Sequence, residues 1–488
     1  MQQKRQGPGE MVMDEMTTMH DDGGPRRQHV AFRSGYIWVA LGIALGAGFP
    51  LGAYLAVALS VGFPLGSGVA SVIQTHGHVQ LVGWVGLFIM GISLHVIPRL
   101  AGVPMAHLRW SGWILWLMAV GLGLRSVGHP VLAALTEEAW MRPVVWLVAA
   151  SGLLEWGGIL LYAVLLGRTL CGMAELGARP ALRMVRPYMG MMATGWVLYA
   201  CLNLVLLIHM ALRGTVVVPQ EWNQLAIQGF MGLVLLPVAF AFSVRMLPLY
   251  LRLPAPTWSV RGIAYAYGVT VMVQLLPTAP ALSRLAPQGA LVLSSLGMML
   301  KGGVILWFVW QLDLLTRRQP PWTVQRKLHP GPERRPTRPG LPDYGEFGRF
   351  ERLVYAAYAW LVLAAGGEVV SGATTLLGNA LVISTTAIRH IYLLGFMTLL
   401  IFGMAVRMLP GFWHKRHVAK PALVEATFWL GNIAVGGRVL LFLLPAGVWN
   451  TVPGSLLGAR MAFALSGVLG WGAVVCLATN LWKTAQKE

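Results

Sequence analysis

The chain has 488 residues, of which 56% are hydrophobic and only 11% are charged, and its net charge is +19. This composition excludes an ordinary soluble globular protein and is typical of a protein that crosses a membrane many times. The cysteines Cys171, Cys201 and Cys476 form no CxxC or CxxCH pattern. This pattern argues against a disulfide framework, a thiolate zinc site and covalently attached haem c.

The apolar segments of the chain predict an all-α polytopic membrane protein with about twelve transmembrane helices. Residues 1–33 are polar and basic and predict a disordered cytoplasmic tail. Transmembrane helices 1–8 are expected in 34–315 and helices 9–12 in 351–488, with a basic cytoplasmic linker at 316–350 between them. The expected spans are 35–60, 75–98, 111–128, 143–167, 188–212, 223–249, 262–282, 288–313, 353–377, 385–410, 422–445 and 456–482.

The distribution of positive charge predicts the orientation of these helices. Most of the 37 Lys and Arg residues fall in the tails and in every second loop, including the 316–350 linker. Such residues accumulate on the cytoplasmic side of membrane proteins. Both termini are therefore expected in the cytoplasm, with the protein in the inner membrane of a prokaryote. The charge is assigned to orientation in the lipid bilayer and not to nucleic-acid binding.

Three of the expected spans share one sequence frame. The segments HVQLVGWVGLFIMGISLHVIP, QGFMGLVLLPVAFAFSVRMLP and HIYLLGFMTLLIFGMAVRMLP end at Pro98, Pro248 and Pro410. Their first positions are His78, Gln228 and His390. Further matches are Gly83 with Gly395, Gly91 with Gly403 and Arg125 with Arg438. Because the three spans are four apart, the chain divides into three four-helix units with expected pseudo-threefold packing.

Histidines at the outer mouths of spans 2 and 10 are the main candidates for a cofactor site. A buried imidazole is costly unless its nitrogens are satisfied, so an intramembrane histidine is a candidate functional residue. If units one and three pack around a threefold axis, His78 and His390 come from parallel helices at one depth and predict a bis-His axial site for haem b. The alternative is that each is an interfacial histidine hydrogen bonded to a neighbouring helix.

His76 is expected to have a different role. On a helix it projects roughly 200° away from His78, so the two side chains are not expected to ligate one iron. His76 is expected to be a capping or loop residue, or a ligand of a second metal together with His129 or His209. Copper or zinc suits imidazole ligands.

Other charged residues near the expected haem have candidate roles. Arg389, Arg438 and Arg125 lie near the outer helix ends and are the expected partners of the haem propionates, with interfacial snorkelling as the alternative. The charged residues expected inside the membrane are Glu155, Lys301 and Glu368. They are candidates for a proton relay or a substrate pathway, or for an interhelical ion pair such as Lys301 with a Glu.

These motifs resemble known families. Twelve spans in three units, with histidines on spans 2 and 10, resemble subunit I of the haem-copper oxidases. The HxH at His76 and His78 and the RH…G…R.LPG run from Arg389 to Gly411 resemble the NnrS family, membrane haem proteins of nitric oxide metabolism. The resemblance implies haem binding and a role in electron transfer or in nitric oxide response.

The haem-copper enzymes also take three histidines from helices 6 and 7 for a second metal, and a further histidine on helix 10. This chain has no histidine between His209 and His329, and position 388 is Ile388. An oxidoreductase of the binuclear kind is therefore not expected.

The main hypothesis is a haem b-binding membrane protein in electron transfer or in nitric oxide response or detoxification. A six-coordinate bis-His iron has no open position and favours electron transfer, and whether the protein is an enzyme stays open. One alternative is a secondary transporter that uses the intramembrane Glu and Lys residues. Another is a non-catalytic scaffold subunit of a respiratory complex, with cytochrome partner subunits.

Overall fold

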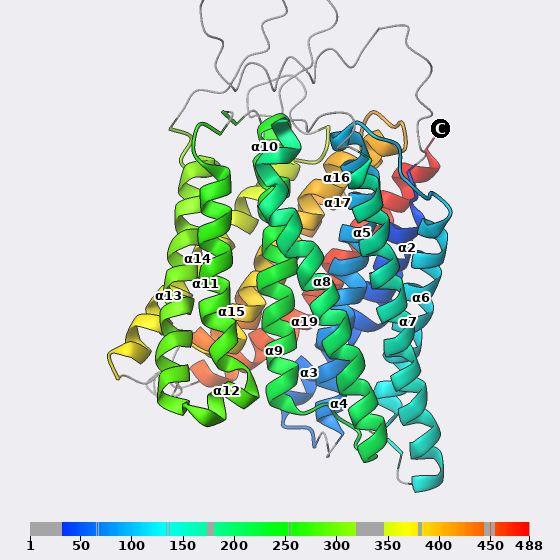
Figure 1. Ribbon diagram of the computed structural model, residues 1–488, viewed down its shortest axis with the longest axis vertical. Coiled ribbons are helices and arrows are strands. Elements are labelled where there is room, and N and C mark those ends of the chain that lie inside the picture. The colour runs from blue at the N-terminus through cyan, green and yellow to red at the C-terminus, as the bar shows by residue number, and fades with distance from the viewer. Residues whose placement is uncertain are drawn as a thin grey trace, which may run out of the picture.

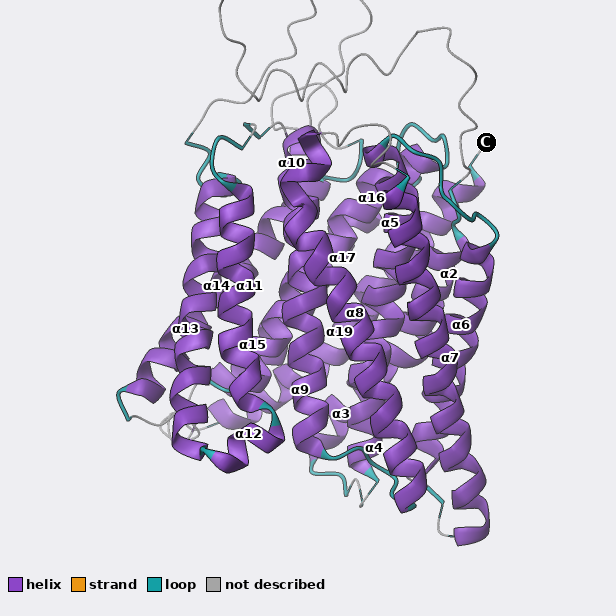
Figure 2. Cartoon of the chain, in the orientation of Figure 1, coloured by secondary structure: helices purple, strands orange, loops and turns teal. Residues whose placement is uncertain are grey.

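The computed structural model describes residues 32–64, 66, 68–132, 134–135, 137–172, 180–251, 253–254, 256–318, 346–378, 383–443, 449 and 454–487. The tail expected at 1–33 and the linker expected at 316–350 lie almost wholly outside the described residues. Within the described ranges the chain forms helices and loops and no strand (Figure 2).

Twelve long helical segments make up the described part of the chain (Figure 1). The elements are α2 (Gly35–Ile43), η1 (Ala44–Gly48), α3 (Phe49–Val61), α4 (Val69–His78), η2 (Val79–Gly86), α5 (Leu87–Ala101), α6 (Trp110–Leu132), α7 (Glu138–Cys171), α8 (Pro180–Arg213), α9 (Gln220–Phe230), η4 (Met231–Leu235), α10 (Leu236–Leu251), α11 (Val260–Thr278), the short α12 (Pro280–Leu285), α13 (Pro287–Leu312), α14 (Phe350–Leu376), α15 (Thr385–His390), η5 (Ile391–Thr398), α16 (Leu399–Phe412), α17 (Pro421–Leu443) and α19 (Ser455–Gln486). Four of the segments are continuous helices with a π-helical stretch (η): α2–η1–α3, α4–η2–α5, α9–η4–α10 and α15–η5–α16.

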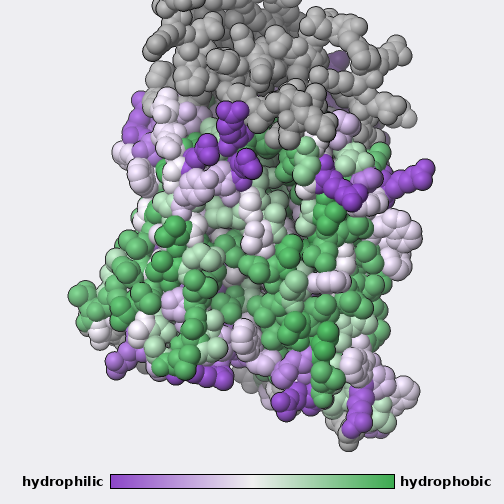
Figure 3. Space-filling view, viewed as in Figure 1, coloured by the Kyte–Doolittle hydropathy of each residue, from purple (hydrophilic) through white to green (hydrophobic). Residues whose placement is uncertain are grey.

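Ten of these segments in the described ranges are long and apolar enough to cross a membrane, and the other two are α11 and α17. Figure 3 shows a broad hydrophobic belt around the visible face, with hydrophilic side chains gathered toward both ends. Large apolar side chains such as Trp113 and Trp307 point outward from the helices, at 63% and 53% exposure. A soluble protein rarely exposes an apolar surface of this extent. The predicted all-α polytopic membrane fold is confirmed.

The helices are arranged with pseudo-threefold symmetry. Nine outer segments form three arcs, in which α6, α7 and α8 make the first arc, α11, α13 and α14 the second, and α17, α19 and α3 the third. The other three segments, α4–η2–α5, α9–η4–α10 and α15–η5–α16, fill the centre, where 83%, 67% and 83% of their apolar windows are buried. No other candidate span among the described residues exceeds 50%. Each arc therefore joins the last two helices of one unit to the first helix of the next.

The three inner segments share the frame that the sequence repeat predicts. In unit one η2 begins directly after His78, and in unit three η5 begins directly after His390. In unit two η4 begins three residues after Gln228. A π-turn holds one more residue than an α-turn and often marks a functional position in a helix. The three segments are thus α–π–α helices, with the π-stretch at the same position in units one and three and two residues later in unit two.

The matched glycines provide equivalent close contacts between helices. A Cβ atom at Gly83 would lie 2.7 Å from the Ile43 side chain, and one at Gly91 would lie 2.6 Å from Tyr36, both in the first segment of unit one. In unit three, Gly395 and Gly403 approach α14, the first helix of that unit, in the same way. In units one and three the absence of a Cβ therefore lets the second helix pack closely against the first.

Aromatic side chains fill the centre of the bundle around the second inner segment. Phe240 lies 4.3 Å from Phe308 and 5.3 Å from Tyr267 between ring centroids, and Trp196 lies 4.8 Å from Phe230. All five rings are essentially inaccessible. The sixth and seventh segments, α9–η4–α10 and α11, therefore contribute packing side chains at the centre.

Candidate functional site

His76 and His390 lie on inner segments and face the third arc, where Arg438 of α17 lies beside them. The three side chains are close enough for their charges to interact. Nδ1 of His76 donates a hydrogen bond to the Gly48 carbonyl at 2.8 Å, and Nδ1 of His390 donates to the Thr386 carbonyl at 2.8 Å. A carbonyl oxygen only accepts, so each Nδ1 carries the proton and each Nε2 keeps its lone pair. Metal-binding histidines are held in this way by a backbone carbonyl.

The first helical segment supplies the backbone that holds His76. The π-turn η1 ends at Gly48, whose carbonyl accepts the His76 proton. One turn further on, a Cβ atom at Gly52 would lie 2.5 Å from Cε1 of His76. Only glycine at this position leaves room for the ring. The local sequence of the first segment, and not that of the His-bearing helix, therefore fixes where the His76 side chain lies.

Arg438 is the buried cation of this site. Its Nη2 donates to the Gly52 carbonyl at 3.2 Å, and its guanidinium lies 4.7 Å from the centre of the Phe463 ring. The side chain is 9% exposed, and among the described residues its Nε has no hydrogen-bond partner. Arg389 lies beside His390 and donates to the Gln224 side-chain oxygen. The site thus combines two imidazoles with two guanidinium groups.

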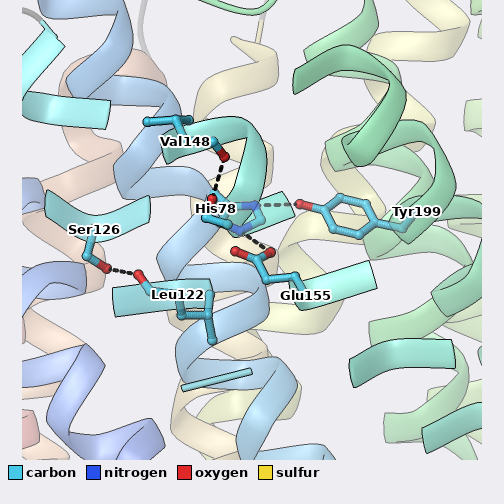
Figure 4. Close-up of polar contacts among 7 residues, drawn as sticks. His78, Leu122, Ser126, Val148, Glu155 and Tyr199 are labelled. Carbon is cyan, nitrogen blue, oxygen red and sulfur yellow. Dashed lines mark hydrogen bonds and ion pairs between the residues drawn. The ribbon is translucent and has the colours of Figure 1, made fainter. Parts of the chain in front are cut away.

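His78 belongs to a different cluster, on the first arc side of the centre (Figure 4). Its Nε2 donates to Glu155 Oε2 on α7 at 2.7 Å, and its Nδ1 accepts from the Tyr199 hydroxyl on α8 at 2.9 Å. His78 and Glu155 are only 5% and 1% exposed. Both ring nitrogens of His78 are therefore occupied by protein groups.

Arg125 and His129 on α6 complete this first cluster. Arg125 lies within electrostatic reach of Glu155 and Tyr199, and His129 donates from Nε2 to the Val216 carbonyl at 3.0 Å. A cavity of about 20 Å³ lies between Arg125, His78 and Tyr199, which is room for about one water molecule. Among the described residues, Arg125 Nε and Nη1 and Glu155 Oε1 are buried without a hydrogen-bond partner.

The structure therefore divides the residues predicted from the sequence between two clusters. His390, Arg389 and Arg438 lie together, whereas His78, on the inner segment α4, lies with Arg125 of the first arc. The expected pairing of His78 with His390 is not observed among the described contacts. His78 contacts Glu155 and Tyr199 of the first arc, whereas His390 lies near Arg438 of the third arc.

His76 takes the place beside His390 that the sequence argument gave to His78. The rotation of roughly 200° between positions two apart on a helix turns His76 toward the third arc when His78 faces the first. The HxH spacing indicated that His76 and His78 point in opposite directions. It did not indicate which of the two faces the third arc.

The second arc holds a third buried cluster. Lys301 Nζ on α13 lies 2.8 Å from Glu368 Oε1 on α14, and the Tyr392 hydroxyl donates to Glu368 Oε2 at 2.9 Å. A Cβ at Gly302 would lie 2.6 Å from the Ala365 carbonyl, so this glycine lets α13 and α14 approach. The expected ion pair of Lys301 with a Glu is confirmed. Each arc thus encloses one polar cluster of its own.

The described residues show no site for a second metal. In these ranges no group of three or more His, Cys, Asp or Glu side chains is arranged to hold a metal ion. His76 and His129 lie in different clusters, and His209 lies on the exposed surface of α8. The expectation of copper or zinc held by these three histidines is therefore not supported.

Three arcs around three inner α–π–α segments define an integral membrane protein with the fold of the haem-copper oxidases. A heme-copper terminal oxidase dimer, solved by cryo-EM with insights into its catalytic mechanism, is similar to this chain with a TM-score of 0.56 and 14% identity. The match covers 93% of this chain and 83% of that chain. At this identity the likeness establishes the fold alone. No family model and no curated protein sequence matches the chain.

Proposed function

We propose that the chain binds haem b between His76 and His390 and acts in electron transfer. The observation that carries this proposal is the pair of imidazoles beside Arg438, each with Nδ1 held by a backbone carbonyl and Nε2 left to ligate. The haem, when bound, supplies a one-electron redox centre. His76 replaces His78 in the ligand pair that the sequence repeat suggested.

Arginine residues near His76 and His390 suit the propionate groups of a haem. Arg438 and Arg389 offer planar guanidinium donors to the propionate carboxylates. Gly52 has no Cβ and so leaves room for the His76 ring against the first segment. A bis-His iron leaves no open position, so the arrangement favours electron transfer over gas binding. A role in nitric oxide response, as the NnrS-like motifs suggest, requires one of the two histidines to leave the iron.

The orientation of the site follows from the positive-inside rule. With both termini in the cytoplasm, His76 and His390 lie toward the outer face of a prokaryotic inner membrane. A redox partner is therefore proposed on that side, such as a cytochrome subunit of a respiratory complex. A scaffold subunit without haem would share this placement but would not need the imidazole pair.

The transporter alternative loses its main support. Lys301 is paired with Glu368, and Glu155 is hydrogen bonded to His78, so all three intramembrane charges have partners within the bundle. Buried ionisable groups are the usual sign of a substrate or ion pathway when they face a water-filled cavity. Here structural pairing accounts for them.

The test is the visible spectrum of the purified full-length protein and its histidine variants. A pyridine haemochrome assay and a reduced-minus-oxidised spectrum are expected to show low-spin haem b. His76→Ala and His390→Ala are expected to remove that spectrum, whereas His78→Ala and the exposed control His209→Ala keep it. A colourless wild-type protein would refute the function. Loss of the spectrum in His78→Ala but not in His76→Ala would refute the ligand assignment.

A further inference from the structure

A narrow apolar cavity lies at the centre of the bundle, away from the three polar clusters. Its volume is about 130 Å³, and it is lined by α5, α8, α10, η5 and α16. Ile92 and Val96 line it from α5, Val238 from α10 and Ala405 from α16. It occupies the half of the bundle near the end that carries the C-terminus, at the top of Figure 1. We call this cavity the inner slot.

The inner slot is elongated along the helices. On α5 its lining runs from Phe88 to Leu100, which spans about 18 Å at a rise of 1.5 Å per residue. On η5 and α16 it runs from Met397 to Met408, or about 16 Å. These lengths are about half of a ~30 Å hydrocarbon core, which is the thickness of one leaflet. The slot therefore has the length and direction of a lipid chain in one leaflet.

The lining of the slot is almost wholly apolar. Ser93 is one of its two polar side chains, and its hydroxyl is hydrogen bonded to the Met90 carbonyl at 2.9 Å and to Tyr162 at 2.7 Å. A water molecule needs two or more polar partners to occupy a cavity, and an apolar cavity of similar size stays dry. The other lining groups are aliphatic, aromatic or thioether. Six of them are the adaptable side chains Met189, Met192, Met246, Met397, Met404 and Met408.

The other polar side chain of the lining marks one end of the slot. Arg245 lies near the end of α10, on the side of the bundle that carries the C-terminus. A guanidinium group suits a phosphate, to which it can present two parallel donors. A ligand with an apolar chain and an anionic head therefore matches both the walls and the end of the slot.

We propose that the inner slot binds one acyl chain of a membrane phospholipid, with its phosphate headgroup near Arg245. Ile92, Val96 and Val238 keep accessible surface, although they lie between inner segments of the bundle. An acyl chain contacts these side chains along the full length of the slot. The bilayer around the protein supplies such chains. The proposal does not depend on the haem site.

The experiment is native mass spectrometry of the full-length protein during stepwise removal of lipid in detergent. Val96→Phe and Val238→Phe direct a ring into the slot from half-buried positions. Leu363→Phe is the matched control, because Leu363 is 57% exposed on the outer face of α14. The wild type and the control are expected to retain one phospholipid per chain after the other lipids have left. The two slot variants are expected to retain at least tenfold less, with unchanged elution on size exclusion.

A second measurement keeps the proposal testable if the variants do not fold. Wild-type protein in nanodiscs made with brominated acyl chains is expected to show strong density between α5 and α16 in a cryo-EM map. Equal retention in the slot variants, release of all phospholipid together, or an isoprenoid quinone in place of phospholipid would overturn the proposal. An empty slot in the brominated nanodiscs would do so as well.

Discussion

Replacing one member of the Lys301–Glu368 ion pair is expected to destabilise the protein more than replacing both. The two charged atoms are 2.8 Å apart, and the side chains are only 9% and 6% exposed, so water screens the pair little. Removing one partner of a buried pair leaves an uncompensated charge and costs about 3–5 kcal/mol. We expect this loss in the free energy of unfolding for Lys301→Met and for Glu368→Gln.

The double variant removes both charges and keeps an acceptor for the Tyr392 hydroxyl. Its expected cost is therefore about 1 kcal/mol or less, and the coupling energy of the cycle is at least about 5 kcal/mol. The measurement is SDS-induced unfolding in mixed micelles, followed by tryptophan fluorescence. Glu425→Gln is the control, because the Arg352–Glu425 pair at 2.8 Å is 37% and 34% exposed and is expected to contribute at most about 1 kcal/mol. Additive losses in the cycle, or single variants no worse than this control, would refute the reasoning.

Three further predictions concern close contacts and the first cluster. Gly52→Ala is expected to lower the haem content in a pyridine haemochrome assay, because its Cβ would lie 2.5 Å from the His76 ring. The control Gly42→Ala, on the same segment, meets nothing within 4 Å and is expected to keep the wild-type haem content. Equal haem content in the two variants would contradict the geometry. Gly302→Ala is expected to destabilise by about 1–3 kcal/mol through its contact with the Ala365 carbonyl, whereas the adjacent Gly303→Ala, with open space, should stabilise by about 0.5–1 kcal/mol in the same unfolding assay. Tyr199→Phe is expected to cost about 1 kcal/mol by removing its hydrogen bond to His78 while leaving the visible spectrum unchanged, and a spectral shift would place His78 at the haem.

The sequence predicted the fold through two simple signals. Apolar length gave the twelve segments, and the common frame ending at Pro98, Pro248 and Pro410 gave the three units. Both depend on local properties of the chain, namely helix length in a bilayer and repetition along the sequence. The matched glycines, such as Gly91 against Tyr36, show that the repeat is also a repeat of packing.

The partners of the candidate residues were harder to predict, because they depend on rotation about helix axes. A repeat shows which positions are equivalent, and equivalent positions around a threefold axis face three different arcs. His78 therefore meets Glu155, and His390 lies with Arg438. The role of Gly52 and the Gly48 carbonyl in holding His76 has no sequence motif, since it arises from contact between the first and second segments.

The π-turns of the inner segments have a consequence for how this protein can change. A π-turn holds one residue more than an α-turn, so deleting one residue from η2 or η5 would restore an ordinary α-turn while the histidine before it keeps its direction relative to the packed, proline-ended half. The inner helices can therefore lose a residue at this place without redirecting a histidine, whereas a deletion in their α-helical parts would turn the histidine by about 100°.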